Sequence, residues 1–87
     1  MLTLAEHPDI QDAVNVARLE WPRAGEAWEA TRWTLARDPW IGRRLTHGEA
    51  WVLVCEGSRS NGFPTVVVQY EIHDSIVVIE GVTFGTP

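Results

Sequence analysis

The stretch TVVVQYEIHDSIVVIEGVTF, residues 65–84 of this 87-residue chain, decides the fold. β-Branched and aromatic residues dominate it on both sides of a polar interruption, and such residues favour extended strands. The interruption, His73-Asp74-Ser75, has the length and composition of a tight hairpin turn. The sequence therefore predicts two antiparallel strands, 65–72 and 76–84, joined at that turn.

A third strand is predicted just upstream, over residues 51–56, which repeat the same apolar composition. The segment 57–64 that follows it contains Asn61-Gly62, a strong turn signal. The link between these two strands is therefore a loop, and the three strands together form an antiparallel sheet.

Further toward the N-terminus the apolar residues change from a period of two to a period of 3.6, which indicates helices. The first helix is predicted over residues 8–19 and ends near Glu20, because Pro22 disfavours helical geometry at Trp21. The second runs from 22 or 23 to 37, where Asp38-Pro39 stops it. Their short connection predicts an antiparallel helical hairpin. Residues 2–4 are apolar enough to add a short N-terminal strand.

The predicted fold class is α+β: a helical hairpin followed by a three-stranded antiparallel sheet, with the helices on one face. No linker or internal repeat divides the chain, so residues 1–87 form one domain. Within the second helix one face is predicted to be buried, and Trp33 lies well off that face. The members of the buried face are Ala24, Ala27, Trp28, Thr31 and Leu35.

Charge and composition narrow the function classes. The chain has twelve acidic residues against seven basic ones, and residues 48–87 hold five acids with Arg59 as their only arginine. This balance disfavours direct nucleic-acid binding by the sheet half. No apolar run approaches the length of a membrane span, and the first ten residues do not resemble a signal peptide. A single cysteine, Cys55, fits a reducing cytoplasm.

The order of elements resembles the RelE/ParE superfamily of toxins from type II toxin–antitoxin pairs. The segment Gly42-Arg43-Arg44-Leu45 after the helices and His47-Gly48 before Trp51 are similar to that family. The hairpin 68–79 resembles its central hairpin most specifically. The resemblance implies a bacterial toxin-like protein whose partner is an antitoxin protein.

The departures from that family concern catalysis. Ribonuclease members place basic residues on the open face of the sheet to neutralise the cleaved phosphate. Here the matching positions are Val52, Val54, Val66 and Val67, and nothing basic follows the last strand. The resemblance therefore implies inhibition by protein binding, with the usual RNA-cleaving residues absent.

An enzymatic alternative stays open through the remaining basic and imidazole side chains. An mRNA interferase with an unusual site would draw on Arg43, Arg44, His47, Arg59 and His73. His47 and His73 are interpreted as surface residues, because neither has a catalytic companion at a recognisable spacing. No set of His, Cys, Asp and Glu shows metal-ligand spacing, so neither a metal site nor a cofactor is predicted.

The open face of the sheet is the preferred partner surface. Strand alternation directs Val52, Val54, Val67 and Glu71 away from the helices, where valines ringed by carboxylates suit a protein segment. With the exposed Trp33 they are the predicted partner-binding residues. Self-association is the other way to cover these surfaces, and a non-toxic interaction or dimerisation module is the remaining alternative.

Overall fold

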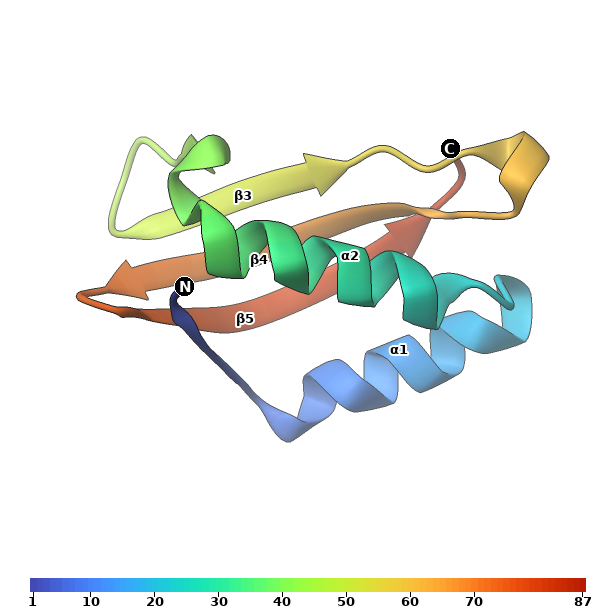
Figure 1. Cartoon of the computed structure of the whole chain (residues 1–87), viewed down its shortest axis with the longest axis horizontal. Helices are drawn as coiled ribbons and strands as arrows, with labels where there is room; N and C mark the ends of the chain where they lie inside the picture. The colour runs from blue at the N-terminus through green and yellow to red at the C-terminus, as the bar shows by residue number, and fades with distance from the viewer.

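A computed structural model describes all residues, 1–87, and shows two helices against a five-stranded sheet (Figure 1). In chain order the elements are β1 (Thr3–Glu6), α1 (Pro8–Glu20), α2 (Ala24–Arg37), β2 (Arg43–Arg44), β3 (Ala50–Cys55), β4 (Thr65–His73) and β5 (Ile76–Gly85). Short 3-10 helices, η1 (Pro39–Ile41) and η2 (Arg59–Asn61), follow α2 and β3. The α+β class and the helical hairpin are confirmed.

The sheet has the order β1-β5-β4-β3-β2. The strands β3, β4 and β5 are the three antiparallel strands expected from sequence. The expectation of three strands was nevertheless incomplete, because the sheet has two more. β1 pairs in parallel with β5, and β2 pairs antiparallel with β3. The N-terminal strand thus exists, and the sheet is mixed.

Two physical reasons explain why the sequence pattern did not indicate the pairing of these two extra strands. β1 acquires its partner across almost the whole chain, with Thr3 opposite Ile76, and local sequence carries no signal for such pairing. β2 consists only of Arg43 and Arg44, residues with no strand preference, and its geometry comes from pairing with Val52 and Trp51.

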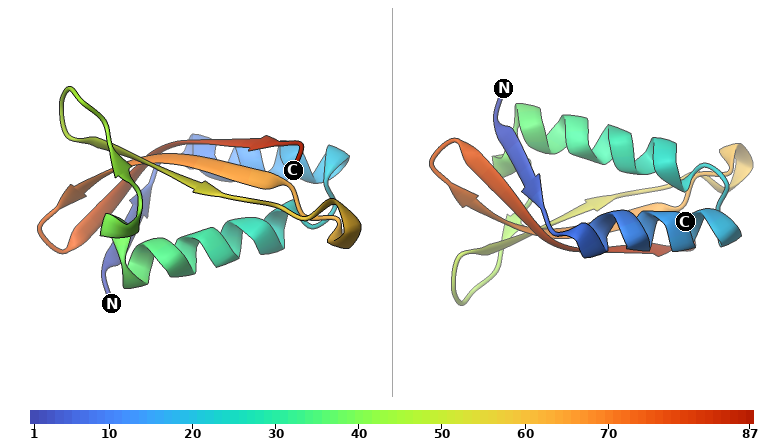
Figure 2. Two further views of the ribbon diagram at one scale, coloured as in Figure 1. Left: turned by 90° about the horizontal axis from the view of Figure 1, so that it is seen from above. Right: turned by 90° about the horizontal axis from the view of Figure 1, so that it is seen from below.

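Both helices pack on the same side of the sheet, with α2 across its centre and α1 along β5 (Figure 2). The predicted face of α2 is buried throughout, and Trp28 is only 2% exposed. It packs in one core with Ile10 and Val14 of α1 and with inward residues of the strands. Neither helix is long and apolar enough to cross a membrane.

A β-bulge in β5 keeps the inward face apolar along the whole strand. Gln69 lies opposite Gly81 while Tyr70 lies opposite Ile79, so Glu80 is the extra residue. The bulge changes which positions face the helices. Ile79 faces them before the bulge, and Val82, opposite the buried Val68, faces them after it. Glu80 itself is exposed.

Candidate functional site

The outer edge of β3 is only half covered by another strand. β2 lies opposite Trp51 and Val52, and Leu45 N–H donates to the carbonyl of Ala50. In an antiparallel strand, every second residue points its backbone N–H and C=O toward the same neighbouring strand. Ala50 and Val52 point these groups toward β2, and Val54 is the next residue that points them to the same side. No strand lies opposite Val54, whose N–H and C=O therefore face a free edge.

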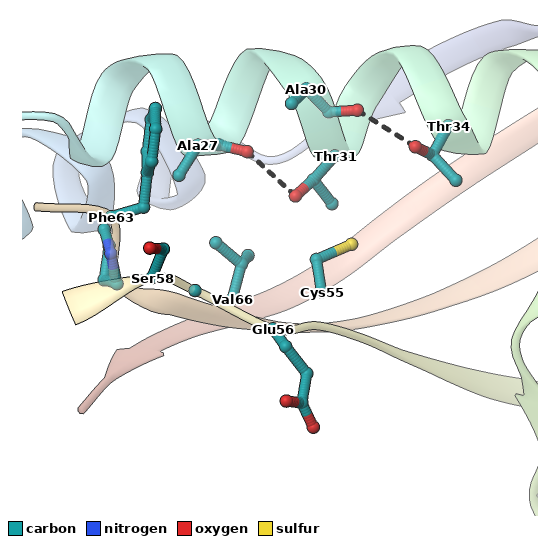
Figure 3. A pocket seen from close by; sticks show the side chains of 11 residues that line it. Ala27, Ala30, Thr31, Thr34, Cys55, Glu56, Ser58, Phe63 and Val66 are labelled. Carbon is teal, nitrogen blue, oxygen red and sulfur yellow. Dashed lines mark hydrogen bonds between the residues drawn. The ribbon is translucent and has the colours of Figure 1, made fainter. Parts of the chain in front are cut away.

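A hollow of about 300 Å³ lies on the helix side of this edge, between α2 and the end of β3 (Figure 3). Ala27, Ala30 and Thr34 form its helical wall, and Phe63 closes one end. Figure 3 shows the Cys55 side chain directed toward α2, whereas the Glu56 carboxylate points to the opposite side of the sheet. The small helix residues leave this space because they do not reach the strand.

A second hollow lies beside the same edge and is bordered by Ile41, Arg43, Val52 and Val54. Ile41 is exposed, and Val54 is 52% exposed. Side chains of a strand point alternately to the two faces of a sheet, so an extended segment added at Val54 would direct its side chains toward both hollows in turn. The edge therefore has the features of a peptide-binding site.

Arginines flank this edge on both sides. Arg43 and Arg44 lie in the neighbouring strand, and Arg59 lies in η2, which follows β3. None of the three takes part in an ion pair, since the arginines in ion pairs are Arg23 and Arg32. An acidic segment would find unpaired positive charge at both ends of the edge.

Tyr70 fixes the segment that carries β2. Its hydroxyl donates a 2.6 Å hydrogen bond to the carbonyl of Pro39 in η1. Burial raises the pKa of Tyr70 to about 12, with a smaller opposing effect from its hydrogen bond with the Gly42 backbone. Gly42 passes so close to Tyr70 and to the Val52 carbonyl that a Cβ would clash with both. This close approach holds η1 and β2 against the sheet.

The structure brings together three of the predicted partner-binding residues. Val54 and Val67 are direct cross-strand neighbours, and Val52 lies two positions before Val54 on the same face. Glu71 lies on this face too, nearer the hairpin turn, and contacts His73 at 2.9 Å. Trp33 is 58% exposed but lies on α2, on the other side of the molecule's sheet, so it belongs to a separate surface.

The five catalytic candidates do not form one site. Glu71 pairs with Ala50 at one end of β3, close to His73, while Arg59 follows the other end. Arg43 shares the open face with Val52, and Arg44 shares the helix face with Trp51. His47 lies in the loop between β2 and β3. The segment η2, which contains Arg59, lies at the opposite end of the sheet from the β2–β3 loop and the β4–β5 turn, where the histidines lie (Figure 1).

Sequence reasoning missed the free edge of β3 and one cluster of side chains. The edge becomes visible only when β2 is known to begin at Arg43, opposite Val52, and therefore to leave Val54 without a partner strand. The cluster consists of Glu49, Glu71 and His73, each with a donor atom within 4.8 Å of the others. Its members come from two strand ends, and only the pairing of Ala50 with Glu71 brings them together.

Comparison with protein-family models finds no matching family, and comparisons with curated proteins and with solved structures find no match either. The resemblance to RelE/ParE toxins therefore stays a prediction from the sequence.

Proposed function

We propose that this chain is the toxin-like component of a bacterial type II toxin–antitoxin pair, located in the cytoplasm, and that it acts by binding proteins. The free edge of β3 is the observation that carries the proposal, because it offers unpaired backbone groups between two hollows. The order of helices and strands resembles that of the RelE/ParE superfamily, and this resemblance supports the same function.

The proposed antitoxin segment is extended and acidic. It adds as a strand beside Val54, and its apolar side chains enter the hollows bordered by Phe63 and by Ile41. Its acidic residues meet Arg43 and Arg44 at one end of the edge and Arg59 at the other. These arginines favour an acidic segment over a basic or neutral one. Main-chain hydrogen bonds supply affinity, and the hollows supply specificity.

Val54→Pro is the decisive variant. Proline lacks an N–H and is tolerated in edge strands where that N–H faces outward, so the fold is retained while the outward donor of Val54 is lost. We expect Val54→Pro to weaken binding to the protein encoded by the adjacent gene by about tenfold or more, measured by calorimetry after co-expression identifies the complex. Val54→Thr keeps both the shape and the N–H, and it should bind like the wild type.

Trp33→Asp separates the two exposed surfaces. A loss of binding in Trp33→Asp with none in Val54→Pro would move the partner to the helical surface and contradict the edge proposal. A thermal melt of each isolated variant controls for folding.

A further inference from the structure

The hairpin end of the sheet gathers one imidazole and two carboxylates. Glu71 and His73 are two positions apart on β4 and share the open face, and His73 Nε2 lies 2.9 Å from Glu71 Oε1. Glu49 precedes Ala50, the cross-strand partner of Glu71, and so reaches the same place from β3. One donor atom of each of the three residues lies within 4.8 Å of the other two.

No permanent cation compensates this pair of carboxylates. Arg44 and Glu49 border a further small hollow together, yet no ion pair joins their side chains. His73 is the only ionic partner of Glu71, and Glu49 has none. Two like charges this close repel each other, and a bound cation removes that repulsion.

The donor types select the class of cation. Imidazole nitrogen together with carboxylate oxygen suits zinc and its first-row neighbours, whereas magnesium and calcium prefer oxygen alone. Donors of four-coordinate zinc, each about 2.0–2.1 Å from the metal, lie roughly 3.4 Å apart. Glu49 and His73 are exposed, so their side chains have room to close from the observed spacing to that one.

We propose that Glu49, Glu71 and His73 form a binding site for a divalent transition-metal ion, with zinc as the best fit. Three protein donors leave a fourth position for water or for a donor from another molecule. The site lies at the hairpin end, away from the free edge beside Val54, and the proposal does not depend on antitoxin binding.

The three histidines of the chain make the test specific. Side-chain NMR of the isolated protein during addition of zinc chloride follows His7, His47 and His73 separately. We expect saturable shifts at His73 at one equivalent of metal and none at His47. His7 contacts only one carboxylate, that of Glu80 at 3.6 Å, and serves as a comparison with two donors instead of three. Magnesium chloride should leave all three rings unchanged.

Substitutions then test each donor by calorimetry with zinc. His73→Ala, Glu71→Gln and Glu49→Gln should each weaken binding by about tenfold or more, since even outer partners of metal ligands have effects of that size. His47→Ala, in the same loop as Glu49, should bind within about twofold of the wild type. Glu49 lies outside the regular strands, so Glu49→Gln should leave the fold intact and test the loss of the carboxylate alone. Absence of saturable binding below millimolar zinc, shifts centred on His7 or His47, or wild-type affinity in His73→Ala would each overturn the proposal.

Discussion

Tyr70 shows how one side chain can connect distant parts of this molecule. Its ring is buried in the core beneath α2, stacked with Trp51 at 6.5 Å between centroids, while its hydroxyl reaches Pro39. A buried phenol that donates to a backbone carbonyl stabilises the fold mainly in its neutral form, because the phenolate would lose both that donated hydrogen bond and the solvation it has in water.

The free energy of unfolding should therefore fall between pH 10 and 12. The pKa of Tyr70 is raised from 10 to about 12 in the folded protein, so over this range the folded state keeps a proton that the unfolded state releases. Stability that is complete below pH 10 is thus lost as the pH rises through 12. Urea unfolding at several pH values measures the effect.

The composition of the chain makes this measurement clean. Tyr70 is the only tyrosine and the chain has no lysine, so no other side chain ordinarily titrates in that range. Absorbance of the phenolate near 295 nm reports Tyr70 directly. Tyr70→Phe should lose the pH dependence, and a wild-type midpoint near pH 10 would show that the ring is accessible to water.

At the scale of elements, the attachment of η1 and β2 decides how much of β3 is free. Gly42 lies at the junction of these two elements, where a Cβ would come within 2.7 Å of the Val52 carbonyl and would also clash with the Tyr70 hydroxyl. The backbone can approach the sheet this closely only because glycine has no side chain.

Gly42→Ala should detach β2 and expose the rest of the β3 edge. We expect a lower melting temperature together with a Tyr70 titration midpoint that moves down from about 12 toward 10, because water reaches the hydroxyl. Gly81→Ala is the matched control, since a Cβ there meets no atom within 4 Å. Equal effects of the two substitutions would mean that glycine content alone, and not close approach, governs stability.

For the whole molecule, the distribution of charge sets the expectation for catalysis. Residues 48–87 hold one arginine against five acidic residues, and the structure separates Arg59 from His47 and His73. The purified protein should therefore leave ribosome-bound mRNA intact in a cell-free translation reaction, as read by primer extension. Codon-specific cleavage that disappears in Arg59→Ala would contradict this and establish the mRNA interferase alternative.

Sequence reasoning succeeded here wherever a local period determined the outcome. The spacing of Trp28 and Leu35 predicted the buried face of α2, and strand alternation placed Val54 and Val67 together on the open face. It failed where pairing between distant segments determined the outcome. Glu49 meets His73 through sheet register, and β2 forms from two arginines that have no strand preference.

The pairing of β1 with β5 has a consequence for synthesis on the ribosome. Thr3 is made 73 positions before its strand partner, Ile76. At about 5–20 residues per second, β1 waits several seconds without a partner while the helices and the first hairpin already have theirs. During that time the nascent chain exposes the β5-binding edge of β1 to other proteins. Completion of the sheet is thus a late event, reached only after β5 has emerged.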